Sequence, residues 1–197
     1  RFRAAVLVNR QLDDVVLPAV MIDDTHGGYL ATKHLLMIGR TCAGFMAGPR
    51  TSYSGAGRMR GFRRALAEAG IIDVERRVRY CRPDVEDGEA ITTEFLAAWP
   101  QLDALFCYND LVAVGALRAC IARELHVPED VAIIGFDDVR LAALVTPPLT
   151  TCRVPRFEIG AMAMELLLTR IDGAGDEHDQ ITIDPELIIR ESAPCVG

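Results

Sequence analysis

The sequence of 197 residues predicts an α/β fold built from doubly wound parallel sheets with helices on both faces. Short apolar runs alternate along the chain with segments whose apolar residues recur at helical spacing. The apolar runs are continuous rather than alternating, as at 131–136, which is typical of strands buried on both faces. Right-handed crossovers between parallel strands then leave few topologies, all of them doubly wound.

The first half of the chain contains three expected strands and two expected helices. The strands are the apolar runs 6–8, 18–22 and 43–47. A helix is expected at 27–38, because apolar residues recur there at helical spacing, and Gly39 suits its end. Residues 48–57 are expected to form a loop rich in glycine and serine, and a second helix follows at 58–69.

The second half continues the same alternation. Its expected strands are 78–81, 102–108, 131–136, 149–154, 181–183 and 187–190, of which the last two form a pair around Asp184 and Pro185. Its expected helices are 86–98, 111–123 and 157–171, with one or two helical turns at 139–144. The acidic stretch 172–180 contains glycine and predicts a solvent-exposed loop.

Composition and charge exclude several classes of protein. The formal net charge of −7 does not favour DNA binding by this chain alone, because phosphate contacts need a clustered positive face. The six cysteines include no Cys-x-x-Cys pair, so we expect buried free thiols in a reducing cytoplasm and no metal site. No apolar run approaches the ~18 residues of a membrane span, and no signal peptide is recognised.

Polar side chains follow four expected strands at their carboxyl ends, where open parallel α/β sheets bind ligands. They are Asn9 and Arg10, Arg58 beyond the loop after 43–47, Asn109 and Asp110, and Asp137 and Asp138. Amides, carboxylates and an arginine fork suit a polyhydroxylated ligand, because they donate to and accept from neighbouring hydroxyl groups. No Ser/His/Cys set accompanies them, so the pattern indicates binding rather than catalysis, without a cofactor.

Each of these residues also has a purely structural interpretation. Asn109 could be only a helix N-cap, and Asp137 with Asp138 could cap the turn that follows them. Arg58 could be a surface residue of its helix, and Asn9 could simply end a strand. Their joint placement at strand ends favours the binding interpretation.

The segment 54–61 superficially suggests a dinucleotide-binding fingerprint, because it follows a strand and precedes a helix. Its spacing, G-x-G-x-x-x-G from Gly55 to Gly61, is one residue too long, and the loop before it is too long for a tight turn. A Rossmann-type dehydrogenase that binds NAD is therefore kept only as an alternative.

Nine segments of the chain, in order, resemble the effector-binding core of the LacI/GalR family of repressors. They are 8–10 (VNR), 23–28 (DDTHGG) with 34–35 (HL), 47–49 (AGP), 58–63 (RMRGFR), 109–115 (NDLVAVG), 127–131 (VPEDV), 135–138 (GFDD), 147–151 (PPLTT) and 190–192 (RES). Each segment alone is weakly specific, whereas nine in the family's order form a specific signal that spans about Val6 to Ser192.

The resemblance implies a periplasmic-binding-protein-like fold of two Rossmann-like lobes joined by three crossovers. The crossovers would fall near 20–24, 149–152 and 181–184. The complete C-terminal lobe would contain residues 25–148 and 184–197. An incomplete N-terminal lobe would contain residues 1–20 and 152–180.

The resemblance also implies a sugar or sugar derivative in the cleft between the lobes, bound by Asn9, Arg58, Asn109 and Asp137. Arg156 falls near a position where some relatives place an aromatic residue against the sugar, and an arginine there could favour an acidic or phosphorylated ligand. Further departures are Arg40, where the family commonly has histidine, and Asp24, where asparagine is frequent.

The function implied is that of the effector-binding and dimerisation core of a sugar-responsive transcription repressor, in which effector binding controls DNA affinity. Arg1-Phe2-Arg3 leads abruptly into an apolar run, so we expect the helix-turn-helix head and the first part of the N-terminal lobe to be missing. DNA would be bound only through that head, by a cytoplasmic homodimer without membrane contact. A periplasmic sugar-binding transport protein is the other alternative, which a secretion signal in the complete gene or disulfides would favour.

Overall fold

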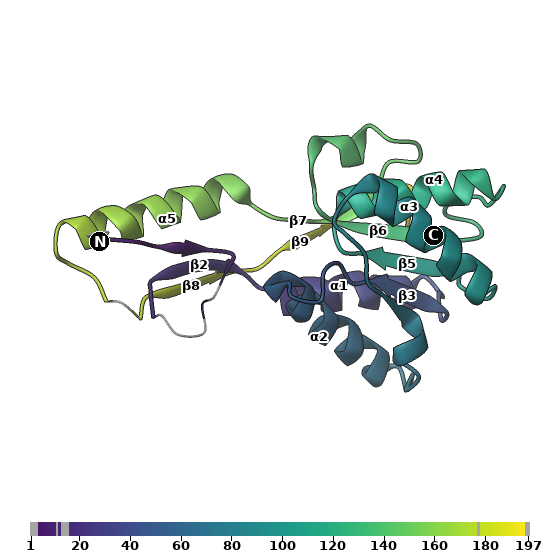
Figure 1. Ribbon diagram of the computed structural model, residues 1–197, viewed down its shortest axis with the longest axis horizontal. Helices are drawn as coiled ribbons and strands as arrows, with labels where there is room; N and C mark the ends of the chain where they lie inside the picture. Colours follow the sequence, from purple (N-terminus) through teal and green to yellow (C-terminus); the bar gives the residue numbers. More distant parts are fainter. Residues whose placement is uncertain (1–3, 11, 13–15, 177, 196–197) are drawn as a thin grey trace.

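The chain folds into two lobes, each built around its own sheet (Figure 1). The computed structural model describes residues 4–10, 12, 16–176 and 178–195, so the expectation about Arg1-Phe2-Arg3 lies outside the described residues. The smaller sheet has the strand order β1-β2-β8, and the larger has the order β4-β3-β5-β6-β7-β9. Every neighbouring pair is parallel except β7 and β9. The predicted α/β fold with parallel-sheet lobes is confirmed.

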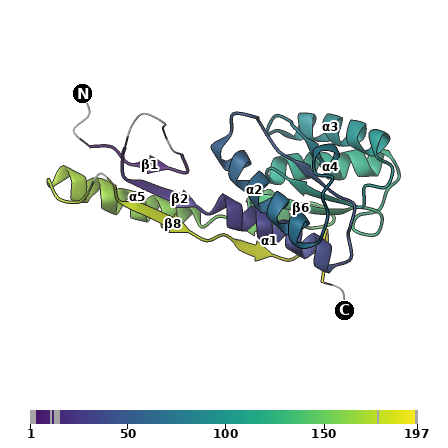
Figure 2. The ribbon, with the colours of Figure 1, turned by 90° about the horizontal axis from the view of Figure 1, so that it is seen from below.

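The small lobe combines segments from both ends of the chain. Its strands are β1 (Leu7–Val8), β2 (Ala19–Ile22) and β8 (Gln180–Ile183). The central strand β2 pairs in parallel with both neighbours, and Ala19 is aligned with Leu7 on one side and Gln180 on the other. Helix α5 (Arg156–Ile171) packs along β1 and β2 and covers one face of this sheet (Figures 1 and 2).

The large lobe has three layers. Its strands are β3 (Ala43–Met46), β4 (Val78–Arg79), β5 (Ala104–Cys107), β6 (Ala132–Asp137), β7 (Thr150–Arg153) and β9 (Glu186–Ile188). Helices α1 (Asp24–Met37) and α2 (Tyr53–Glu68) pack together on one face, and α3 (Val85–Ala98) and α4 (Asp110–Ala122) pack together on the other (Figure 1). Two short 3₁₀ helices, η1 (Glu75–Arg77) and η2 (Arg140–Ala143), lie in the connections.

The core of the large lobe consists of two apolar clusters, one on each face of the sheet. On the α1/α2 side, Phe45 stacks on Phe106 with a centroid distance of 4.7 Å, and Phe106 contacts Phe136 at 6.4 Å. All three rings are fully buried. They support the carboxyl ends of the strands, where the candidate site lies.

Side-chain caps start the helices directly after the strands. The Oδ1 of Asp23 accepts a hydrogen bond from the His26 N–H (2.7 Å) at the start of α1. The Oγ of Ser52 accepts one from the Gly55 N–H (3.0 Å) at the start of α2. Because a cap satisfies backbone donors that would otherwise lack a partner, these polar residues fix where each helix begins.

The glycines of segment 54–61 lie inside helix α2, so the expected loop 48–57 holds only for residues 48–52, and the expected helix start near Arg58 is wrong. The helix begins at Tyr53, and Gly57 and Gly61 permit close packing against α1. A Cβ on Gly61 would lie 2.1 Å from the Thr25 carbonyl oxygen and 2.4 Å from the Tyr29 nitrogen. These glycines therefore serve helix contact rather than phosphate binding, which removes the basis of the dehydrogenase alternative.

The chain passes between the two sheets at three places: between β2 and α1, between β7 and α5, and between β8 and β9. Strands 181–183 and 187–190 were expected to form a pair. Instead β8 belongs to the small sheet, and β9 pairs antiparallel with β7 in the large one. Asp184 and Pro185 thus link two lobes rather than two arms of a hairpin.

The six cysteines are free. Four are buried, Cys42 is partly buried and Cys195 is exposed, so the expectation of buried thiols holds for four of the six. Burial raises the pKa of Cys81 to about 11 and that of Cys152 to about 12. In the described part of the chain, no helix combines the length and the apolar character that crossing a membrane requires.

Candidate functional site

Arg58 lies in the second turn of α2 and reaches the carboxyl ends of the central strands. Its Nε donates to Oδ1 of Asp24 (2.9 Å), and its Nη1 donates to the carbonyl oxygen of Tyr108. The guanidinium carbon lies 3.6 Å from the centroid of the Phe136 ring. Only 5% of Arg58 is exposed, so its charge is buried, neutralised by Asp24 and fixed in orientation.

Asp137 is the last residue of β6 and faces the remaining nitrogen of Arg58. Its Oδ1 lies 3.9 Å from Nη2 of Arg58, and 34% of its side chain is exposed. Burial raises the pKa of Asp137, and the positive charges of Arg58 and Arg156 oppose that shift. Arg58 and Asp137 thus offer a donor and an acceptor side by side, as a ligand hydroxyl group requires.

The backbone at Asp137 is unusual. Asp137 has a φ of 104° and Asp138 a φ of 50°, both in the region that side chains other than glycine rarely adopt. Such strained positions persist only where the surroundings hold them, and they cluster at functional sites.

Two sets of side-chain contacts hold this strained loop. Asp110 accepts hydrogen bonds from the Thr151 hydroxyl (2.6 Å) and the Val139 N–H (2.8 Å), and burial raises its pKa to about 6. On the other side, the carboxylate of Asp138 pairs with Arg190 (2.6 Å) and Arg153 (2.9 Å). Asp138 is therefore a structural anchor rather than a helix cap.

Asn109 forms the N-cap of α4. Its Oδ1 accepts from the Val112 N–H (2.9 Å), and its Nδ2 donates over a longer 3.3 Å to the Pro83 carbonyl oxygen. The capping interpretation therefore describes the geometry, and both polar atoms of the side chain have partners in the protein. A contact between Asn109 and a ligand stays a prediction.

Asn9 and Arg156 lie on the side of the small lobe. Asn9 has a φ of 49°, and its Oδ1 accepts from the Ile22 N–H (2.9 Å), which leaves Nδ2 without a partner among the described residues. Arg156 starts α5, is exposed, and donates from Nη2 to the Asp138 carbonyl oxygen (3.2 Å). Each therefore retains donors that a ligand could use.

Pockets for small ligands measure roughly 300 to 1,000 Å³, and a cavity of about 720 Å³ lies between the lobes. Its lining residues are Asn9, Arg10, Leu12, Arg50, Thr51, Ser52, Tyr53, Ser54, Ala56 and Tyr108. Asn9 is in this set, whereas Arg58, Asn109, Asp137 and Arg156 are not. Tyr108 connects the two groups, because it lines the cavity while its carbonyl oxygen binds Arg58.

The structure thus brings Arg58 and Asp137 together, connects Arg58 to the cavity wall through Tyr108, and places Asn9 in the lining of the cavity. Sequence reasoning missed Tyr108, Arg50 and Ser52. The same strand-end rule identifies them afterwards, because Tyr108 ends one expected strand and the other two follow 43–47. The described residues contain no group of three or more His, Cys, Asp or Glu side chains suited to a metal ion.

Comparison with known proteins identifies the family. A model of the periplasmic binding protein-like domain family matches residues 32–193. The chain belongs to this family of two-lobed binding domains.

The relatives narrow the class further. The HTH-type transcriptional regulator GalR of Escherichia coli K12 is 35% identical over 187 residues, which cover 95% of this chain and 54% of GalR. The HTH-type transcriptional repressor PurR of Haemophilus influenzae strain PittEE is 37% identical over 181 residues, which cover 89% of this chain and 54% of PurR. The chain therefore spans about half the length of these curated relatives.

Among solved structures, the complex of the transcriptional regulator CelR with cellobiose superposes with a TM-score of 0.91 at 34% sequence identity. The match covers 95% of this chain and 58% of CelR. Together with GalR and PurR, it confirms that the chain corresponds to the effector-binding core of LacI/GalR regulators.

Proposed function

We propose that this chain is the effector-binding and dimerisation core of a sugar-responsive bacterial transcription repressor. A small polyhydroxylated effector binds between the lobes and controls the DNA affinity of the protein. The two-lobed fold and the cavity between the lobes support binding of a small effector, and the regulators among the relatives favour this function over that of a transport protein. The sugar in the CelR complex supports the class of effector.

The juxtaposition of Arg58 and Asp137 carries the proposal. Asp24 and the Tyr108 carbonyl oxygen hold the guanidinium, so that Nη2 is presented beside the Asp137 carboxylate. A polyol with adjacent hydroxyl groups can accept from Arg58 and donate to Asp137. Because Arg58 is already held before the ligand arrives, binding loses little conformational entropy at this side chain.

The other proposed contacts are weaker or conditional. Asn9 offers Nδ2, which has no partner in the described part of the chain, from the small lobe, and Arg156 reaches toward the Asp138 backbone from the start of α5. Asn109 contacts the effector only if its Nδ2 leaves the 3.3 Å bond to Pro83. In this proposal the N-terminal lobe comprises 1–20 and the expected segment 152–180 without its first two residues, because β7 extends to Arg153 in the large sheet. The C-terminal lobe comprises 25–148 and 184–197 together with β7.

Because the proposed contacts come from both lobes, the affinity for the effector depends on the angle between the lobes. An effector that binds the closed arrangement more tightly shifts the population toward it, by as much as its difference in affinity for the two states. In the proposed cytoplasmic repressor this shift changes the spacing of two DNA-reading heads and with it the affinity for DNA.

A homodimer is part of the proposal. Helix α4 and the adjacent η2 expose several large apolar side chains on the large lobe: Leu111, Ile121, Leu141 and Leu144. We infer that these side chains belong to the dimer interface, because exposed apolar surface shared by neighbouring elements marks protein interfaces. A second copy of the chain related by twofold symmetry would cover the same patch on both partners.

Isothermal titration calorimetry with a panel of neutral sugars, cellobiose included, tests the function. One sugar is expected to bind, and Asp137→Asn is expected to weaken it about tenfold or more, because a hydrogen bond to a charged group is lost. Asp176→Asn in the exposed loop after α5 is the matched control and should bind like the wild type. If no sugar binds, or both variants bind equally, the proposed site is wrong.

A further inference from the structure

Among the described residues, the lining of the interlobe cavity includes two arginines and no acidic side chain. Arg10 approaches from the small lobe, and Arg50 from the loop that follows β3 in the large lobe. Neither forms an ion pair with any described residue, although the chain carries a net charge of −7. Unpaired positive charge in a cavity of an acidic protein calls for a negatively charged ligand.

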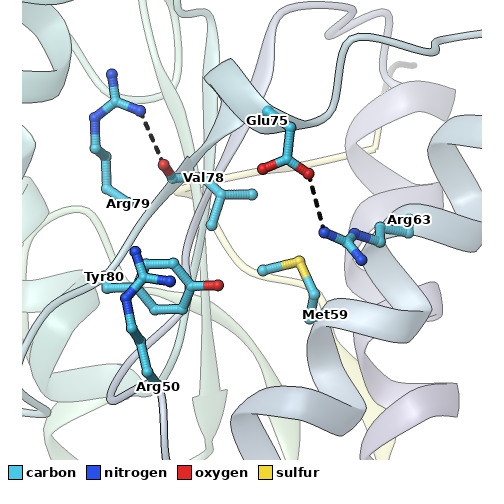
Figure 3. A pocket seen from close by; sticks show the side chains of 7 residues that line it. All are labelled: Arg50, Met59, Arg63, Glu75, Val78, Arg79 and Tyr80. Carbon is cyan, nitrogen blue, oxygen red and sulfur yellow. Dashed lines mark hydrogen bonds and ion pairs between the residues drawn. The ribbon is translucent and has the colours of Figure 1, made fainter.

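Arg50 is held in place without being neutralised. Its guanidinium carbon lies 3.7 Å from the centroid of the Tyr80 ring, and Figure 3 shows the guanidinium lying across the face of that ring. Stacking on an aromatic face fixes the plane of the guanidinium. The N–H donors lie in that plane and stay available for a carboxylate or a phosphate.

The neighbouring arginines behave differently. Arg50 also borders a second, smaller hollow of about 340 Å³, which Figure 3 shows together with Arg63 and Arg79. Arg63 pairs with Glu75 (3.2 Å), and Arg79 donates to the carbonyl oxygen of Val78 (2.8 Å). Neither of these two lines the interlobe cavity. Of these three arginines, Arg50 is therefore the one whose positive charge is available to a ligand in the interlobe cavity.

Apart from the two arginines, most polar side chains that line the cavity carry hydroxyl groups, which can donate hydrogen bonds and bear no negative charge. Five hydroxyl-bearing side chains line the cavity: Thr51, Ser52, Tyr53, Ser54 and Tyr108. The Oγ of Ser52 and the hydroxyl oxygen of Tyr108 lie 3.0 Å apart and share one hydrogen bond. Hydroxyl groups rotate to donate, so this wall suits an oxyanion as well as a sugar.

We propose that the interlobe cavity binds an oxyanion, the phosphate ester or carboxylate of a sugar derivative, between Arg10 and Arg50. This inference rests on the proposed function and names the chemical class of its effector. An arginine fork binds either anion through two parallel hydrogen bonds. Because the two arginines belong to different lobes, the bound anion neutralises repulsion between them and stabilises the closed arrangement.

Calorimetric titration of this chain with inorganic phosphate, glucose 6-phosphate and glucose at constant ionic strength tests the inference. Phosphate and glucose 6-phosphate are expected to bind, and Arg50→Ala should weaken both at least about tenfold. Arg10→Ala should act in the same direction. Arg63→Ala removes one positive charge from the adjacent hollow and is the matched control, with a change below twofold.

The three ligands separate the sources of the anion. Tighter binding of glucose 6-phosphate than of phosphate identifies the ester as the ligand, and equal binding identifies recognition of the anion alone; both support the oxyanion site. Absence of phosphate binding, or equal losses in Arg50→Ala and Arg63→Ala, overturns it. Circular dichroism of each variant verifies that the fold is kept.

Failure of this inference and failure of the proposed function give different results. If a neutral sugar binds, and its affinity falls in Asp137→Asn but is unchanged in Arg50→Ala, the proposed function stands and the oxyanion site is wrong. A different result is that phosphate binding depends on Arg50 while neither a sugar nor a sugar phosphate binds more tightly than inorganic phosphate, in the wild type or in Asp137→Asn. In that case the oxyanion site stands and a sugar effector is wrong.

Discussion

The Nε of Arg58 donates to Oδ1 of Asp24 over 2.9 Å, and each side chain is only 6% exposed. This ion pair joins the first residue of α1 to the second turn of α2, next to the carboxyl ends of the strands. A buried pair is expensive to desolvate, and removing one partner leaves the other charge buried without compensation. The pair therefore couples the stability of the helix contact to the orientation of the proposed ligand-binding arginine.

Asp24→Ala is expected to lower the free energy of unfolding by about 3–5 kcal/mol, because the Arg58 guanidinium loses its buried counter-charge. Urea denaturation followed by circular dichroism measures this change. Asp24→Asn keeps the size and one acceptor oxygen, and it should cost less than Asp24→Ala. A loss below about 0.5 kcal/mol in Asp24→Ala, typical of surface substitutions, would contradict this account.

A second prediction concerns the stability of the close contact between α1 and α2 at Gly61. Gly61→Ala should destabilise the protein, because the added Cβ would meet the backbone of α1 at 2.1 Å from the Thr25 oxygen. Backbone atoms cannot turn aside as a flexible side chain can, so the helices must move apart. Thermal denaturation is expected to show a lower Tm.

Gly160→Ala provides the control for this substitution. Gly160 also lies inside a helix, α5, but no neighbouring atom of the described residues lies within 4 Å of a Cβ placed there. Because alanine favours helix over glycine by up to about 1 kcal/mol, Gly160→Ala should leave Tm unchanged or raise it. Equal effects of the two substitutions would show that helix propensity, rather than the approach of α1, governs Gly61.

The sequence predicted the fold class and most elements because local and tertiary preferences agree over most of the chain. The helix end at Gly39 is an example: Gly39 has a φ of 87°, which glycine adopts freely. Segment 53–57 is the exception. Its glycines predict a loop by propensity, but the Ser52 cap and the packing against α1 make it helical.

The sequence predicted which strand ends carry the candidate site residues, but it did not predict the hydrogen-bond partners of their side chains. The strand-end rule places Arg58 and Asp137 near each other, and the structure brings them to 3.9 Å. It cannot show that Asp24 and the Tyr108 carbonyl oxygen already occupy two arms of the Arg58 fork. Such partners depend on rotamers and on residues distant in the sequence, which a pattern along the chain does not encode.

The buried carboxyl group of Asp110 predicts a pH dependence of stability. Burial raises its pKa to about 6, opposed by the bonds from Thr151 and Val139, while Asp137 and Asp138 add to the rise. Its folded-state pKa thus exceeds its unfolded value, and the folded state binds more protons between about pH 4 and pH 6. The stability contributed by this group is therefore present at low pH and lost as the pH rises through about 6.

Urea denaturation of the wild type and Asp110→Asn between pH 4.5 and 7.5 measures this contribution, because the variant cannot titrate at this position. The wild type should be more stable relative to Asp110→Asn at pH 4.5 than at pH 7.5, by a difference on the order of 2 kcal/mol. A constant difference across this range, or one of opposite sign, would show that Asp110 does not titrate there.

Asn109 allows the capping role and the proposed binding role to be separated by two substitutions. Serine caps a helix about as well as asparagine, so Asn109→Ser should keep the stability of the wild type, whereas Asn109→Ala should lose about 1 kcal/mol. The bond from Nδ2 to Pro83 is long, at 3.3 Å, so the amide can turn to a ligand at little cost.

Both Asn109 variants are therefore expected to weaken effector binding several-fold in calorimetric titration, although only Asn109→Ala loses stability. This pattern separates the two roles because the serine hydroxyl reproduces the acceptor that holds Val112 but is too short to replace the amide donor. Wild-type affinity in Asn109→Ser would mean that Asn109 serves α4 alone. Recognition would then depend on Asn9, Arg58 and Asp137, and the strand-end rule would have selected one residue whose role is only to start a helix.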